Sequence, residues 1–300
     1  MAWRSVMISK PAKLKREHFS LAIEQEATAF VPFEDIAVVV LNHREITLTH
    51  SVLSACAEYG ISLFATGDNH QPSGVFLPFL QHSRATRMLR LQLELPKPVA
   101  KQTWAAIVRS KINNQAECLK LAGADGHDRL ESYARRIRSG DTENLEGQAA
   151  AFYFPKLFDA NFHRSQDRWT NAALNYGYAV LRGTIARGLV AHGLLPSLGL
   201  FHASEQNAFN LADDLIEPFR PLVDLFVATQ TNRDGSELQP TDKVALVALL
   251  NTDVGMPRGV MSALSAIEQT VESLVRIYDG EGASMLELPT LIGLQPHQAE

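Results

Sequence analysis

The pattern of hydrophobic and polar positions changes part-way along the chain. Up to about residue 80, short apolar runs rich in β-branched and aromatic residues are separated by turn residues, a pattern typical of β-strands. The one helical pattern in this part covers residues 49–60 and ends at Gly60. We expect strands at 4–9, 19–25, 28–32, 36–42, 61–68 and 75–79.

Beyond residue 80, apolar residues recur every three or four positions, which predicts a succession of helices. The expected helices cover 82–95, 103–123, 131–140, 145–158, 169–193, 209–229, 241–251 and 260–280. The chain is therefore predicted to be α+β. A small β-rich N-terminal domain would span 1–78 and a larger all-α domain 79–285. Residues 286–300, which contain two prolines, would form a loosely ordered tail.

The composition predicts a folded globular protein that is neither secreted nor embedded in a membrane. The 300 residues are 46% hydrophobic and 20% charged, as in ordinary globular domains. No apolar run approaches the roughly 20 residues of a membrane span, and the start MAWRSVMISK lacks the apolar stretch of a secretory signal. We expect a cytoplasmic protein with no membrane association. Two cysteines are too few for a disulfide framework.

Charge gives a mixed indication about nucleic acids. The formal net charge of −5 weighs mildly against DNA or RNA binding, which usually needs a basic face. However, Arg84, Arg87 and Arg90 recur at helical spacing. From the residues alone, these arginines fit either a solvated helix face or a surface that follows phosphates.

The segment around the predicted helix 209–229 combines a core-facing pattern with metal-ligand residue types. Asp214 and Glu217 are three positions apart and share one side of the helix. Pro218 has no N–H, so a kink is expected beside them. His202 precedes Asp214 by twelve residues, in a loop-like stretch. Together they would suit Mg²⁺, Mn²⁺ or Zn²⁺, but a core histidine beside a solvated acidic face explains the spacing as well.

Glu146 is a third candidate. It lies at the start of the predicted helix 145–158, where Asn144 or Thr142 would cap the first turn. The run Ala149, Ala150 and Ala151 would let a neighbouring helix approach closely. Taken alone, Glu146 also fits an acid favoured there by the helix dipole.

Three stretches carry a family resemblance. LEGQAAAFYF, ALNYGYAVLRG, and GLFH followed by LADDLIEPFRPLVD resemble the CRISPR-associated protein 1 family, with the order and spacing of its type II branch. The resemblance covers nearly the whole chain except the last 20 residues. It implies a β-rich dimerisation domain, a helical catalytic domain and a homodimer. Two such dimers would be bridged by one dimer of CRISPR-associated protein 2, and the type II effector nuclease is a further possible partner.

The resemblance also implies a site and an activity. Glu146, His202 and Glu217 match the family's catalytic residues, which hold Mg²⁺ or Mn²⁺. Asp214 matches an acidic position beside the metal that is a ligand in some branches, so its role stays open. The implied protein is a metal-dependent DNA endonuclease and integrase. It would use the 3′-hydroxyl of a short double-stranded fragment to attack a phosphodiester at the boundary of the CRISPR repeat DNA.

Under this resemblance, six residues become candidates for DNA contacts: Arg84, Arg87, Arg90, Lys111, Tyr176 and Arg182. Two alternative functions remain open beside the integrase. A catalytically silent DNA-bridging scaffold of the same fold would lack a ligand, whereas all three positions are filled. A helical metal-dependent phosphohydrolase would show a paired His-Asp motif with further helical histidines, whereas the histidines here are scattered.

Overall fold

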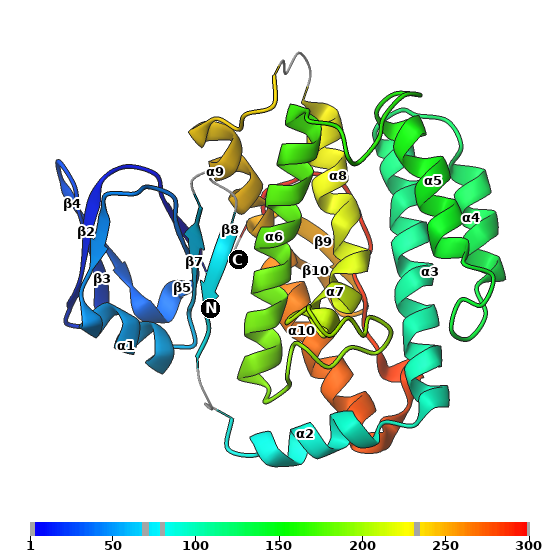
Figure 1. Cartoon of the computed structure of the whole chain (residues 1–300), viewed down its shortest axis with the longest axis horizontal. Helices are drawn as coiled ribbons and strands as arrows, with labels where there is room; N and C mark the ends of the chain where they lie inside the picture. The colour runs from blue at the N-terminus through cyan, green and yellow to red at the C-terminus, as the bar shows by residue number, and fades with distance from the viewer. Residues whose placement is uncertain (1–3, 68–71, 79–81, 231–234, 299–300) are drawn as a thin grey trace.

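The computed structural model describes residues 4–67, 72–78, 82–230 and 235–298. Strands of the N-terminal part lie on one side of the molecule, and helices make up most of the rest (Figure 1). The expected α+β class is confirmed. Within the described ranges, no helix is both long and apolar enough to span a membrane.

Two four-stranded sheets make up the N-terminal part, with helix α1 (His50–Glu58) beside them. The first sheet has the order β1-β5-β7-β8 and the second β4-β3-β2-β6. The strands are β1 (Arg4–Ile8), β2 (Ala12–Glu17), β3 (Ser20–Glu24), β4 (Thr28–Pro32), β5 (Ile36–Leu41), β6 (Ile46–Leu48), β7 (Ser62–Thr66) and β8 (Pro72–Phe76).

The inner strand β5 of the first sheet is buried on both faces. In β5, Val38 and Val40 pack into the core formed with the helices, whereas Val39 packs into a smaller core with α1 and the second sheet. This explains why β5 reads as a continuous apolar run rather than an alternating one. The sheet therefore joins the N-terminal part firmly to the helices. The predicted domain junction after residue 78 falls at 79–81, outside the described residues.

The remaining helices are α2 (Ala85–Glu94), α3 (Lys97–Leu121), α4 (His127–Arg136), α5 (Leu145–Leu157), α6 (Trp169–Ala191), α7 (Asn210–Ile216), α8 (Arg220–Thr229), α9 (Pro240–Ala248) and α10 (Ala263–Arg276). Short 3₁₀ or π turns occupy 33–35, 217–219, 249–251, 277–281 and 283–285. Helix α3 packs against α4, α5 and α8, while α6 packs against α7, α8, α9 and α10 (Figure 1). The long helices α3 and α6 thus flank α8.

Two expectations about the C-terminal part are wrong. It is not all-α, because β9 (Asp253–Met256) and β10 (Gly259–Ser262) form an antiparallel hairpin where the helix 260–280 was expected to begin. Helix α10 starts only after Ser262, whose hydroxyl caps it by accepting from the N–H of Ser265.

The tail is not loosely ordered over residues 286–298. Leu291 is buried, and its N–H donates to Asn114 Oδ1 at 3.1 Å. Thr290 and Gly255 exchange two backbone hydrogen bonds, of 2.8 and 2.9 Å. These contacts hold the tail against α3 and β9 despite its two prolines.

A glycine allows the closest contact between helix α6 and the first sheet. A Cβ at Gly183 would lie 2.0 Å from a ring carbon of Phe64 in β7. We expect Gly183→Ala to destabilise the fold by about 2 kcal/mol, after allowing for the helix preference of alanine. Urea unfolding of this variant and of Gly74→Ala measures it. At Gly74 the nearest atom to a Cβ is 4.0 Å away, so equal losses at the two positions would contradict the clash.

Candidate metal centre

Glu217 lies at a break between two helices. The 3₁₀ turn Glu217–Phe219 separates α7 from α8, so the α-helix is interrupted at Pro218, where a kink was expected. Asn114 of α3 donates to the carbonyl oxygen of Pro218 at 2.8 Å and to that of Pro289 in the tail at 2.9 Å. The turn is therefore fastened to α3, and the Glu217 side chain is only 7% exposed.

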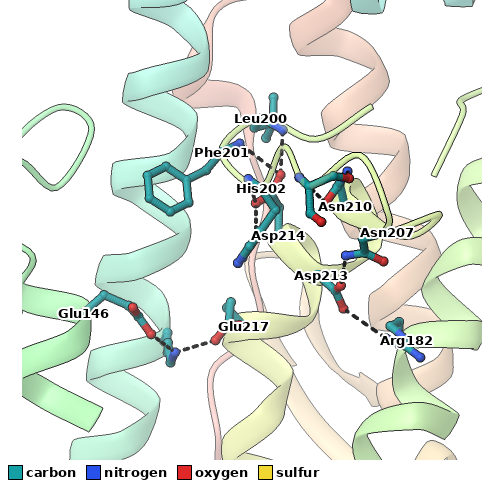
Figure 2. A network of polar contacts seen from close by, with 12 residues as sticks. Glu146, Arg182, Leu200, Phe201, His202, Asn207, Asn210, Asp213, Asp214 and Glu217 are labelled. Atoms are coloured by element: carbon teal, nitrogen blue, oxygen red, sulfur yellow. Dashed lines mark hydrogen bonds and ion pairs between the residues drawn. The ribbon is translucent and has the colours of Figure 1, made fainter. Parts of the chain in front are cut away.

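Glu146 is held by a well-capped helix start. Asn144, with a left-handed φ of 50°, accepts from the N–H of Gly147 at 3.3 Å, so the expected Asn144 cap is confirmed. The Asp141 carboxylate accepts from the N–H groups of Leu145 and Glu146, at 3.0 and 2.9 Å. These bonds fix the first turn of α5 with Glu146 directed at α3 (Figure 2).

The carboxylates of Glu146 and Glu217 converge on one ammonium group. Lys111 of α3 is 6% exposed and pairs with Glu146 Oε1 and with Glu217 Oε2, the latter at 2.5 Å. Arg220 Nε lies 3.0 Å from the other oxygen of Glu217. Two acids and two bases from three segments of the chain thus share a small volume.

Burial and charge oppose one another in this cluster. Burial disfavours the charged forms of both Glu217 and Lys111. Arg220 and Lys111 nevertheless lower the pKa of Glu217 below its ordinary value. Likewise, Glu217 and Glu146 raise the pKa of Lys111 in spite of its burial. The carboxylate of Glu217 and the ammonium of Lys111 therefore stay charged at neutral pH.

Asp214 positions the loop that carries His202. Its buried carboxylate accepts from the backbone N–H groups of Leu200, Phe201 and His202, at 2.5, 3.2 and 3.1 Å. It also lies 2.8 Å from Nδ1 of the His202 ring (Figure 2). Asn210 adds bonds to Ser197 and Ser204 of the same loop. Four bonds to one carboxylate fix both the loop and the ring.

These contacts determine the state of the imidazole. A carboxylate can only accept, so Nδ1 donates and Nε2 carries the lone pair in the neutral ring. The hydrogen bond from His202 to Asp214 is the main cause that raises the pKa of His202, and the charge of Glu217 adds to it. His202 therefore lies within electrostatic reach of Glu217.

The structure brings the three predicted ligands only partly together. Glu146 and Glu217 meet at Lys111, whereas His202 contacts Asp214. Among the described residues, no three His, Cys, Asp or Glu side chains lie close enough to hold a metal ion.

Even so, the donor set fits a hard divalent ion. Two carboxylates already surround one positive charge. Glu217 Oε2 is buried and accepts no aligned hydrogen bond from the described residues beyond the ion pair with Lys111. Two carboxylates and an imidazole suit Mg²⁺ or Mn²⁺.

The predicted DNA contacts fall into two groups. Arg84, Arg87 and Arg90 are exposed at helix α2, and the Arg182 side chain is 41% exposed, with a nitrogen 3.8 Å from Asp213. Lys111 and Tyr176, in contrast, are buried. Neither side chain offers surface to a phosphate or a base in this structure, so DNA contact by these two residues stays a prediction.

A buried polar network behind the site was missed from sequence. The Asp224 carboxylate, 1% exposed, accepts from the hydroxyls of Tyr153, at 3.0 Å, and Tyr178. Arg220 stacks over the Tyr178 ring, 4.6 Å from its centre, which connects this network to Glu217. The sequence did contain one indication of this network: Asp224 lies one helical turn after Arg220, on the same side of the helix.

Asp224 makes stability depend on pH. Burial raises its pKa from 3.8 to about 6, although both tyrosines oppose the shift. The folded state therefore binds this proton more tightly than the unfolded state. As pH rises from 4 to 6 the Asp224 carboxyl loses its proton, and the free energy of unfolding falls. We expect the stability difference, Asp224→Asn minus wild type, to increase by about 2 kcal/mol over that range. Urea unfolding from pH 4 to 7 measures it, and a pH-independent difference would contradict the raised pKa.

The family model of CRISPR associated protein Cas1 matches residues 6–244. The chain belongs to the Cas1 family. A protein of Neisseria meningitidis serogroup C named CRISPR-associated endonuclease Cas1 is 43% identical over 304 residues, covering all of both chains. A Cas1 endonuclease of Saccharolobus solfataricus is 28% identical, over 64% of this chain and 63% of its own.

Solved structures agree with the Cas1 fold. A casposase bound to its integration product has a TM-score of 0.74 at 17% identity, covering 93% of this chain and 90% of its own. A Cas1 protein from Thermotoga maritima has a TM-score of 0.72 at 20% identity, covering 93% and 98%. The fold of the family is therefore present over almost the whole chain.

Proposed function

We propose that this Cas1 protein is a divalent-metal-dependent DNA endonuclease and integrase of CRISPR adaptation. It joins short DNA fragments to the CRISPR array when their 3′-hydroxyls attack the repeat boundary. The observation that carries the proposal is the convergence of Glu146 and Glu217 on one buried cation. The relative from Neisseria meningitidis, similar over its full length, is named an endonuclease, which supports the assignment.

Each residue of the site has a role in this proposal. Glu146, Glu217 and Nε2 of His202 would hold Mg²⁺ or Mn²⁺, which when bound polarises a phosphoryl oxygen and stabilises the charge that develops there. We assign Asp214 the role of orienting the His202 ring and the loop behind it rather than that of a ligand, because its carboxylate accepts four hydrogen bonds. Arg220 balances the charge of Glu217.

DNA and protein partners complete the proposal. The exposed arginines Arg84, Arg87, Arg90 and Arg182 would contact phosphates of the incoming fragment and of the repeat DNA. The protein would act in the cytoplasm as a homodimer of the type II branch, with two dimers bridged by one Cas2 dimer and with the type II effector nuclease as a further partner. A chain of a Cas6-RT-Cas1–Cas2 complex has a similar fold over 36% of its length, with a TM-score of 0.73, which supports the Cas2 assignment.

A joining assay tests the function directly. The purified protein is mixed with Mn²⁺, its Cas2 partner, a supercoiled plasmid carrying the repeat, and a short duplex with free 3′-hydroxyls. We expect the duplex to become covalently joined at the repeat boundary, and a duplex with 3′-deoxy ends to give no product. DNA binding without joining would favour the silent scaffold, and hydrolysis of small phosphoesters without joining would favour the phosphohydrolase.

A further inference from the structure

Lys111 stands out among the lysines of its helix. Lys97, Lys101 and Lys120 of α3 are exposed, whereas Lys111 lies inside the molecule. A buried ammonium is costly unless opposite charges surround it. Glu146 of α5 and Glu217 of the 3₁₀ turn supply those charges, one from each side. The neighbouring positions on α3, Ile107, Val108 and Ile112, are fully buried, so Lys111 lies on the core-facing side of the helix.

The charges around Lys111 cancel. Two carboxylates, Glu146 and Glu217, face two bases, Lys111 and Arg220. A divalent cation approaching this cluster therefore meets little net attraction. It also needs the same oxygens that the ammonium contacts, because Glu217 Oε2 is the atom 2.5 Å from Lys111 Nζ. The ammonium and the divalent ion cannot both lie at that oxygen without strong repulsion.

We propose that Lys111 is a built-in cation that holds Glu146 and Glu217 together in the metal-free protein, and that a divalent ion must displace its ammonium from between them. The inference rests on the proposed metal centre and adds a positioning residue to it. Lys111 keeps the two ligands, 71 positions apart in sequence, converged on one point. The same contact lowers the affinity of the site for Mg²⁺ or Mn²⁺.

Metal binding without DNA tests this inference. We would titrate the full-length protein with Mn²⁺ at neutral pH and measure the free ion by electron paramagnetic resonance. Lys111→Met, which keeps most of the stem but removes the charge, is expected to bind Mn²⁺ at least about tenfold more tightly than wild type. Lys120→Met, an exposed lysine of the same helix, is expected to bind like wild type. Equal or weaker binding by Lys111→Met would overturn the inference.

Two further variants separate this inference from the proposed function. Glu146→Gln and Glu217→Gln should each weaken Mn²⁺ binding, in wild type and in the Lys111→Met background. If neither does, the ion binds elsewhere, and both the metal centre and the role of Lys111 are wrong. If both weaken binding while Lys111→Met does not tighten it, the metal centre stands and only the role of Lys111 is wrong.

A measurement on the wild-type protein covers the case in which Lys111→Met does not fold. Reductive methylation followed by mass spectrometry reports how accessible each lysine is. We expect Lys111 to be protected without metal and to be labelled faster at saturating Mn²⁺, while Lys120 is labelled equally in both conditions. Labelling of Lys111 that Mn²⁺ leaves unchanged or slows would overturn the displacement.

Discussion

Glu217→Gln is expected to slow Mn²⁺-dependent joining of DNA fragments by at least about 10³-fold. Glutamine keeps the size of the side chain but removes the negative charge that a divalent ion requires. The substitution also leaves Lys111 and Arg220 facing a neutral group, so we expect the fold to lose about 3 kcal/mol of stability. Joining rates at several Mn²⁺ concentrations and urea unfolding measure the two effects.

Two matched variants interpret that result. Glu146→Gln should slow joining as strongly but destabilise the fold less, because the Glu146 side chain is 30% exposed and that of Glu217 only 7%. Glu205→Gln alters an exposed acid of the neighbouring loop and should leave both quantities unchanged. Joining that survives in Glu217→Gln, with the fold intact, would remove Glu217 from the ligand set.

Local periodicity predicted most elements of the fold, and it failed where packing between segments decides the structure. Strand β2 was missed because Lys13, Lys15 and Arg16 dominate its composition and leave few apolar positions to signal a strand. Its Ala12 and Leu14 are nevertheless buried, and pairing with β3 and β6 makes it an inner strand. Helix α4 likewise begins at His127, inside a glycine-containing stretch and before the helix expected at 131–140.

The candidate site shows the same division. Asn144, one of the two caps predicted for the helix that carries Glu146, does cap α5, and the helix is interrupted beside Glu217, where a kink was expected. Both features follow from local residue types. The pairing of Lys111 with Glu146 and Glu217 is tertiary, so no local pattern shows it. One signal was present: Lys111 falls three and four positions after Val108 and Ile107, on the apolar face of α3. A lysine on the apolar face of a helix indicates either that the predicted face is wrong or that the lysine is buried and paired with opposite charges.

Asp214→Asn is expected to damage both the fold and the activity. An amide cannot accept four hydrogen bonds, and its NH₂ group would face backbone N–H groups or the His202 ring. We expect a loss of about 3 kcal/mol in unfolding free energy, since buried N–H groups lose their acceptor. Joining should fall about 10- to 100-fold, because the His202 ring loses its orientation. Urea unfolding and joining rates at saturating Mn²⁺ measure these effects.

His202→Ala provides the contrast that identifies the role of Asp214. The His202 side chain is 40% exposed, so its removal should abolish joining yet change stability by no more than about 1 kcal/mol. If Asp214 were a metal ligand instead, Asp214→Asn would weaken Mn²⁺ binding while the metal-free protein kept its stability. The Asp214 carboxylate instead accepts from three backbone N–H groups, so we expect Asp214→Asn to lower the stability of the metal-free protein. Metal binding would then be lost only because the loop carrying His202 moves.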